Sequence, residues 1–278
     1  MDADRLPPGL YIVATPIGNL GDLTPRAADT LRRVDLVLAE DRRVTAKLLS
    51  HAGAKARLAN YNDHTNEAER DSIVGRLGAE AIALVSDAGT PLISDPGYKL
   101  VRAARAAGHD VYTLPGPSAA IAALTLAGLP TDRFLFAGFL PPKSKARLDA
   151  IEELSRVRAT LVFYESGPRL EDTLAALAEG LGERDAAVVR EVSKLHEETV
   201  TGTLSELAVR YERKPPKGEI VIVVGPPPAT AEASDNELDE AIDEALKHHS
   251  PSRAAAEVSA SLNIPKKRAY ARALERSR

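Results

Sequence analysis

Several acidic side chains and one histidine lie in polar segments that follow short apolar or extended runs of the chain. The set comprises Glu40, Asp41, Asp63, His64 and Asp87. Carboxylates and imidazoles exchange protons with a bound molecule, and a carboxylate also attracts a cationic one. In open α/β sheets, ligands bind just beyond the carboxyl ends of the strands. The spacing therefore predicts a polar site at such a sheet edge, in which no single residue stands out as a strong base.

The centre of this site is predicted in the segment from Leu84 to Gly97, which reads LVSDAGTPLISDPG. The segment begins at the end of an apolar run, Ala81 to Val85, that is typical of a buried strand. The glycine and prolines that follow indicate a loop at the end of the strand. We interpret Asp95, which precedes a proline, as the N-cap of a helix from Gly97 to about Ala107. Asp87 caps no helix, and we therefore assign it a binding role.

Loops after three predicted strands are rich in glycine, proline and small residues: Pro16–Gly21, Asp87–Pro91 and Pro115–Ser118. None has the G-x-G-x-x-G pattern of dinucleotide sites, and the chain has no G-x-x-x-x-G-K-[ST] phosphate loop. An uncharged or cationic small ligand therefore fits these loops better than a pyrophosphate. No metal site is predicted, because the chain has no cysteine and none of its six histidines pairs with a carboxylate at ligand spacing.

Short apolar strands alternate with helical segments, which favours an α/β class with mainly parallel sheets and helices on both faces. In the first half we expect strands at residues 10–15, 34–39, 81–85 and 110–114. The pattern then restarts, with strands expected at residues 134–137, 160–164, 186–190, 198–203 and 219–224. The two strands around Lys194 suggest an antiparallel pair in a mixed sheet. We predict an N-terminal domain over residues 1–128 and a C-terminal one over residues 129–228, with a ligand cleft between them.

The last part of the chain differs in composition and charge. Gly225–Ser234, GPPPATAEAS, is a linker by composition. Three short helices are predicted within residues 235–278, and the spacing of their alanines and valine resembles a helix-turn-helix. Residues 235–249 carry six acids and one lysine, whereas residues 265–278 carry six basic residues and one acid. Although the net charge of the whole chain is −4, this asymmetry suggests a local anion-binding face that could contact RNA. The alternative is a plain helical tail whose charged residues are solvated.

Five motifs occur in order along the chain. They are YIVATPIGNLGD at residues 11–22, SDAGTPLISDPG at 86–97, PGPSAA at 115–120, GFLPPK at 138–143 and FYESGPR at 163–169. Together they resemble the ribosomal RNA small-subunit methyltransferase I family, of the tetrapyrrole-methylase superfamily, from about Gly9 to Gly225. One departure is the segment AEDRR, where the family has threonine at the position of Arg42. The resemblance implies two tetrapyrrole-methylase-like α/β domains.

The same resemblance implies S-adenosylmethionine as the cofactor, held in the cleft between the domains. The matching positions are Pro16, Asp87, Thr90, Ser118, Ala119, Glu165 and Gly202. Backbone groups in proline- and glycine-rich loops can approach adenine and ribose closely. Asp87 would attract the positive charge of the cofactor, and Ser118 can also cap the helix that follows it.

The family acts on a ribose hydroxyl, a weak nucleophile, so that both alignment behind the methyl group and a base should help. Asp41 and His64 are the first candidates, because both follow extended segments on the side where Asp87 also emerges. The alternative is that Asp41 caps the next helix and His64 only packs its loop. Further candidates are Glu40, Asp63, Glu165 and Lys194. Basic residues in or beside the motif loops could hold RNA phosphates: Arg42, Arg43, Lys143, Lys145 and Arg169.

The resemblance implies 2'-O-methylation of a cytidine ribose in 16S rRNA of the small ribosomal subunit by a homodimer. Two alternatives are methylation of a tetrapyrrole or other small acceptor, which the acidic body suits, and a non-catalytic RNA- or ribosome-binding protein. Residues 1–8 lack the apolar core of a signal peptide. The longest nearly apolar stretch, Ala119–Leu129, is too short to span a membrane. Since the lack of cysteine also suits a reducing compartment, we expect a cytoplasmic protein.

Overall fold

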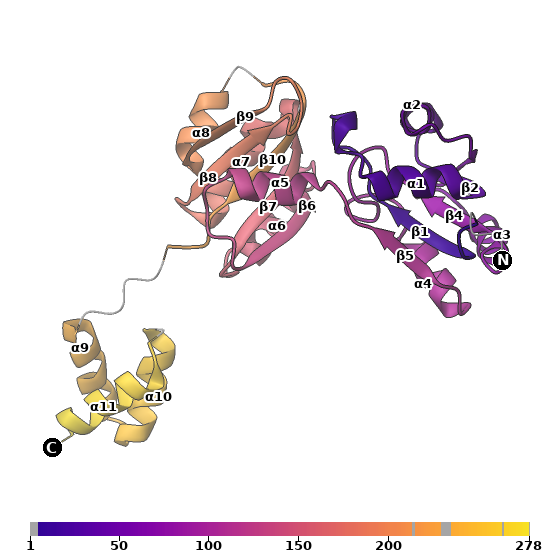
Figure 1. The fold of residues 1–278 in the computed structure, drawn as a ribbon. Coiled ribbons are helices and arrows are strands. Elements are labelled where there is room, and N and C mark those ends of the chain that lie inside the picture. Colours follow the sequence, from indigo (N-terminus) through magenta and orange to yellow (C-terminus); the bar gives the residue numbers. More distant parts are fainter. Residues whose placement is uncertain (1–4, 213–214, 229–234, 263, 278) are drawn as a thin grey trace. The chain divides into compact units, whose positions relative to one another are not determined.

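The computed structural model describes residues 5–212, 215–228, 235–262 and 264–277. The chain forms two compact units, residues 1–226 and residues 227–278 (Figure 1). The larger unit holds two five-stranded sheets, and the smaller unit is helical. Residues 229–234 of the predicted linker lie outside the described residues.

The first sheet of the larger unit is parallel throughout, with the strand order β3-β2-β4-β1-β5. Its strands are β1 (Gly9–Val13), β2 (Leu36–Ala39), β3 (Arg57–Asn60), β4 (Ala81–Leu84) and β5 (Val111–Leu114). Every residue of β1, β2 and β4 is buried, as expected for apolar runs in a sheet covered on both faces. The sequence did not predict β3, because this edge strand has exposed ends and only two central apolar residues.

Helices cover both faces of this sheet. They are α1 (Pro25–Arg33), α2 (Arg42–Ala52), α3 (Glu67–Arg76) and α4 (Tyr98–Ala106). The first two pack on one face and the last two on the other. As predicted, α1 begins with Pro25 in its first turn, and the Thr24 hydroxyl accepts a hydrogen bond from the Ala27 amide. The expected doubly covered α/β layer is therefore confirmed.

The second sheet is mixed and has the strand order β6-β7-β10-β8-β9. Its strands are β6 (Phe134–Phe139), β7 (Thr160–Ser166), β8 (Asp185–Arg190), β9 (Glu198–Thr203) and β10 (Glu219–Val224). Only β6 and β7 pair in parallel, and the predicted antiparallel pairing of β8 with β9 is confirmed. Gly138, at a φ of 65°, marks an irregularity in the register of β6.

Four helices accompany the second sheet: α5 (Ala119–Leu126), α6 (Ser144–Leu154), α7 (Leu170–Leu181) and α8 (Leu204–Tyr211). The helix α5 packs Ala123 and Leu124 against Val162 and Val223 of this sheet. The boundary predicted after residue 128 assigns α5 to the first domain, whereas its packing places it with the second sheet.

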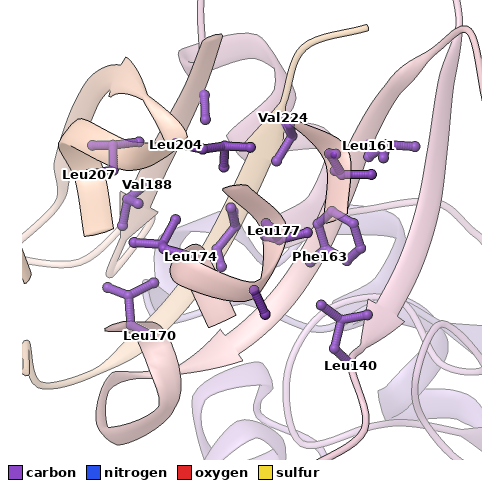
Figure 2. Close-up of a cluster of buried hydrophobic side chains, with 14 of the residues drawn as sticks. Leu140, Leu161, Phe163, Leu170, Leu174, Leu177, Val188, Leu204, Leu207 and Val224 are labelled. Atoms are coloured by element: carbon purple, nitrogen blue, oxygen red, sulfur yellow. The ribbon is translucent and has the colours of Figure 1, made fainter. Parts of the chain in front are cut away.

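The opposite face of the second sheet carries a large apolar core (Figure 2). Leu170, Leu174 and Leu177 of α7 pack over Phe163 and Val188 of the sheet. All five side chains are fully buried. Burial of this apolar area is the main favourable contribution to the stability of the second sheet.

The smaller unit consists of α9 (Asp235–Leu246), α10 (Pro251–Ser261) and α11 (Lys266–Arg276). Its core joins Leu238 and Ile242 of α9 to Val258 of α10, and Ile264 and Ala269 complete it. The three predicted helices of the tail are confirmed, and the alanine and valine spacing that suggested them forms this core.

Replacement of Phe163 by alanine should lower the free energy of unfolding of the larger unit by about 3–5 kcal/mol, because it leaves a cavity in a closed core. The matched control is Phe134→Ala in the neighbouring strand, whose ring is 44% exposed; its cost should stay below about 1 kcal/mol. Denaturant midpoints of both variants provide the measurement. Equal midpoint shifts would show that the core in Figure 2 is not the stabilising one.

Candidate functional site

The larger unit contains a cavity of about 350 Å³, where the loops after β4 and β5 meet β7 and β10. Most of its wall is apolar, with contributions from Ile17, Ile93 and Val221. The polar side chains that line it are Thr90, Ser94, Asp95, Ser118, Tyr164, Glu165, Ser166 and Glu219. An apolar wall with a few polar groups is typical of a small-molecule site.

Backbone hydrogen bonds hold the loops of this cavity together. The Thr15 amide donates to the Gly89 carbonyl at 2.8 Å, and the Gly89 amide donates back at 3.1 Å. Gly89 has a φ of 83°, a conformation that glycine adopts at little cost. The Thr90 hydroxyl donates to the Pro117 carbonyl at 3.0 Å. The three glycine- and proline-rich loops predicted from sequence therefore meet at the carboxyl edge of the sheet.

Asp95 does not cap α4, contrary to our interpretation of the sequence. The N-cap is Gly97, at a φ of 137°, and no side chain caps this helix. Leu92 and Ser94 both adopt left-handed backbone conformations, with φ of 75° and 63°, so the chain turns sharply before the helix begins. As a result, Asp95 lines the cavity. The misleading signal was the Asp-Pro pair, which also occurs in turns that precede a helix.

The Asp95 carboxyl group lies in a negative environment. Burial raises the pKa of Asp95 to about 6; the nearby Ser86 hydroxyl opposes this shift, and the charges of Glu40, Asp87 and Asp63 add to it. Glu40 also has a raised pKa, because of burial and the charges of Asp87 and Asp63. These carboxylates come from the ends of neighbouring strands and their loops, as the sequence predicted for the site.

The other two carboxylates of the cavity wall each pair with a basic side chain. Glu165 accepts hydrogen bonds from the Ser166 amide at 2.8 Å and the Thr173 hydroxyl at 2.7 Å, and it pairs with Arg169 at 3.4 Å. Glu219 pairs with Lys194 at 2.9 Å. Its partners indicate that Glu165 organises the segment between β7 and α7.

The positions predicted for the cofactor fall into three groups. Four of them line the cavity: Thr90, Ser118, Ala119 and Glu165. Pro16 and Asp87 line a second hollow, which shares Ile17, Ala88 and Glu219 with the cavity. Gly202 lies on β9, where it pairs with Ala186, and is not part of the cavity wall.

Ser118 differs from its predicted role as a helix cap. It occupies the N-cap position of α5, but its side chain makes no capping hydrogen bond. It lines the cavity together with Tyr164, a residue that the sequence analysis did not select. Both groups therefore face the cavity and are available to a ligand.

Neither of the first candidates for the base lines the cavity. Asp41 is the N-cap of α2 and accepts a hydrogen bond from the Arg43 amide, which confirms the structural alternative. Hydrogen bonds from Arg43 lower the pKa of Asp41 to about 2, so its carboxylate is a weak base. His64 lies in a separate hollow beside α3, together with Asn62 and Glu69.

Lys194 is also a poor base in this structure. Its ammonium group pairs with Glu191 at 3.0 Å and with Glu219 at 2.9 Å. Burial opposes the protonated form, but the hydrogen bonds to Glu219 and Glu191 prevail and raise the pKa of Lys194. Its aliphatic chain lies against Gly18. Lys194 therefore ties the loop between β8 and β9 to the loop after β1.

The basic residues of the motif loops divide into two sets. Arg43 is bound to Asp41 at 2.7 Å, and Arg169 is bound to Glu165 and to the Leu140 carbonyl. The remaining three, Arg42, Lys143 and Lys145, are exposed. The Arg43 side chain is itself 89% exposed, so Arg43 differs from this second set in its ion pair and not in its exposure.

The arginines of the tail form a ladder of ion pairs between α11 and α9. Arg268 pairs with Asp235 at 2.9 Å, and Arg272 binds both oxygens of Asp239, at 2.5 and 2.8 Å. Arg276 pairs with Asp243. Because both helices place every fourth residue on one face, the acidic and basic runs of the sequence neutralise each other here. Lys266 and Lys267 stay exposed at the start of α11.

The described residues contain neither a group of metal ligands nor a membrane-spanning helix. Among residues 5–212, 215–228, 235–262 and 264–277, no three His, Cys, Asp or Glu side chains gather as metal ligands would. No helix in the same ranges combines the length and apolar character that a membrane span needs.

The chain matches a family model described as Tetrapyrrole (Corrin/Porphyrin) Methylases over residues 9–208, and one described as RsmI C-terminal HTH domain over residues 232–277. It is 55% identical to Ribosomal RNA small subunit methyltransferase I of Erythrobacter litoralis, over 98% of this chain and 97% of that protein. The chain belongs to this methyltransferase family. The protein of the same name from Mesorhizobium japonicum is 48% identical, over 98% of this chain and 94% of that protein.

Solved structures agree with this family assignment at the level of the fold. Uroporphyrin-III-C-methyltransferase from Thermus thermophilus superposes with a TM-score of 0.56 at 25% identity, over 78% of this chain and 93% of that one. A diphthine synthase reaches a TM-score of 0.61 at 15% identity, over 78% of this chain and 90% of that one. The family fold, two α/β sheets followed by a helix-turn-helix unit, is the one that the sequence predicts.

Replacement of Arg272 by alanine should loosen the tail without affecting the larger unit. Since the bidentate ion pair between Arg272 of α11 and Asp239 of α9 is lost, amide hydrogen exchange in these helices should become roughly 3- to 10-fold faster. Lys267→Ala on the exposed side of α11 is the matched control and should leave exchange unchanged. If both variants exchange alike, the ladder does not hold the helices together.

Proposed function

We propose that this protein transfers the methyl group of S-adenosylmethionine to the ribose 2'-hydroxyl of a cytidine in 16S rRNA of the small ribosomal subunit. One observation carries this proposal. Four positions that the family resemblance assigns to the cofactor come from separate parts of the sequence, and they line one cavity: Thr90, Ser118, Ala119 and Glu165. The close relatives are named as methyltransferases of small-subunit ribosomal RNA.

The lining of the cavity fits such a cofactor. Ile17, Ile93 and Val221 offer apolar surface for an adenine ring. The hydroxyl groups of Ser118 and Tyr164 can bond polar groups of the ligand, and the cavity carries negative rather than positive side chains. Bound S-adenosylmethionine would supply a methyl group activated by a sulfonium charge. A negative wall suits that charge and agrees with the exclusion of pyrophosphate ligands.

The residues of this chain would act mainly by positioning. The Thr15–Gly89 bridge and the Thr90–Pro117 hydrogen bond fix the cavity loops, so that the acceptor oxygen can be held in line with the methyl group. The apolar wall excludes water from the reacting atoms. Asp87, in the adjoining hollow, remains our proposed contact for positive charge on the cofactor.

We propose that RNA contacts the exposed basic groups rather than the paired ones. In the larger unit these are Arg42, Lys143 and Lys145, and in the tail they include Lys266 and Lys267. Lysines on such surfaces bind the phosphate backbone and orient the substrate. As the family resemblance implies, we further propose that the protein acts as a homodimer in the cytoplasm.

The direct test uses small ribosomal subunits that have not been methylated at the target and S-adenosylmethionine with a labelled methyl group. We expect label in the RNA, recovered after digestion as 2'-O-methylcytidine. Label on a base or on another ribose would contradict the proposed acceptor. Label on a tetrapyrrole in place of RNA would favour the small-molecule alternative. If the protein binds small subunits without cofactor and transfers no methyl group to them, the non-catalytic alternative is favoured.

Truncation after Pro228 should separate the two roles of the chain. Because the cavity lies wholly in the larger unit, binding of S-adenosylmethionine should be unchanged. RNA affinity should fall, and each lost phosphate contact should reduce the slope of log affinity against log salt by about 0.7 to 0.9. Calorimetry and RNA titrations at several salt concentrations provide the two measurements. An unchanged salt slope and unchanged turnover would show that the tail is not an RNA arm.

A further inference from the structure

Three carboxylates line the cavity, and their partners differ. Glu165 pairs with Arg169, and Glu219 pairs with Lys194, which also pairs with Glu191. Asp95 belongs to none of the ion pairs found among the described residues, and the nearby Ser86 hydroxyl donates to the carbonyls of Ala88 and Gly89. Among the described residues, Asp95 is therefore the cavity carboxylate that forms no ion pair with a basic side chain, and its oxygens are available to a ligand.

The groups that face Asp95 are negative or neutral on every side. Glu40 at the end of β2, Asp63 after β3 and Asp87 after β4 contribute negative charge. Tyr164 of β7 faces it across the cavity. A carboxylate in such surroundings binds a proton more tightly than an exposed one, but still ionises below neutral pH. This combination suits a general base that operates near pH 7.

The backbone around Asp95 is held in an unusual form. Leu92 and Ser94 have positive φ values, which residues other than glycine adopt mainly where the surroundings impose them. A Cβ atom at Gly97 would lie 2.6 Å from the Leu84 side chain, and one at Gly138 would lie 3.2 Å from the Ser94 hydroxyl. The loop is thus fixed between β4 and β6, and Asp95 is positioned as a rigid group.

We propose that Asp95 is the catalytic residue that accepts the proton of the acceptor hydroxyl. This inference rests on the proposed function, since it requires a hydroxyl acceptor. In the step, the ribose oxygen forms a bond to the methyl carbon while the bond from that carbon to sulfur breaks, and its electron pair stays on sulfur. The hydroxyl proton passes to the Asp95 carboxylate and later to solvent. Charge and atoms balance without any further reactant.

Asp95→Asn is the direct test, because it keeps the shape and removes the base. We expect the single-turnover rate on small subunits to fall about 10²-fold or more, while calorimetry shows binding of S-adenosylhomocysteine unchanged within about 3-fold. Asp95→Glu should recover part of the rate. The matched control is Asp110→Asn, an exposed carboxylate at the opposite end of the sheet, which should keep the rate of the wild type.

A second test, the pH dependence of stability, does not depend on methyl transfer. Folding raises the pKa of Asp95 from 3.8 to about 6, so between these values the folded protein binds more protons than the unfolded chain. The contribution of Asp95 to the free energy of unfolding is therefore fully present below pH 4 and is lost as the pH rises through 6. Asp95→Asn should therefore melt at a higher temperature than the wild type above pH 6 and lose this advantage near pH 4. The kcat/KM of the wild type should fall below pH 6, and that fall should be absent from the residual activity of the variant.

The possible outcomes are distinct. If Asp95→Asn keeps the wild-type rate, Asp95 is not the base. If the variant loses affinity for S-adenosylhomocysteine but transfers methyl normally once saturated, Asp95 is a cofactor ligand instead. If the melting temperatures of Asp95→Asn and the wild type are equal at every pH, folding does not raise the pKa of Asp95. If the wild type itself transfers no methyl to small subunits, the proposed function fails first, and the assay reports this before any variant is compared.

Discussion

The pair of backbone hydrogen bonds between Thr15 and Gly89 is the contact on which the site depends. It joins the loops after β1 and β4, two strands that are neighbours in the sheet. A third loop, after the other neighbour of β1, is joined through Thr90 and Pro117. In a parallel sheet all three loops leave at the same edge, and the buried strands give this edge its rigidity. The cavity is therefore a consequence of strand order rather than of one motif.

Electrostatic pairing explains which charged residues remain available. Arg169 and Lys194 neutralise two carboxylates of the cavity wall, and Arg43 is bound to Asp41. In the tail, the ladder from α9 to α11 uses three arginines for folding. Unpaired groups in such a protein stand out, because burial of an unpaired charge is unfavourable and needs a compensating role. Within the described part of the chain, Asp95 is the cavity carboxylate that pairing leaves over, and the unpaired basic groups include Arg42, Lys143, Lys145 and the exposed lysines of α11.

Much of the fold could be predicted, because buried parallel strands form continuous apolar runs. The edge strand β3 could not, since half of it faces solvent and its sequence has no such run. The family resemblance located the cavity loops and found Thr90, Ser118, Ala119 and Glu165, but it could not tell which positions share one cavity. Asp95 was wrongly assigned as a helix cap because of the proline that follows it, and the ion pairs of the tail arginines could not be predicted because a pattern along the chain does not reveal partners. The pairing of Arg272 with Asp239 joins residues on different helices.

We propose above that the cavity in the larger unit holds the methyl donor. Photo-crosslinking of the protein to S-adenosylmethionine with a labelled methyl group, followed by peptide mapping, tests this most directly. The account predicts label in peptides that carry Thr90–Asp95, Ser118–Ala119 or Tyr164, and loss of label when unlabelled S-adenosylhomocysteine competes. Competed label confined to the hollow around His64, or to the helices of the tail, would contradict it.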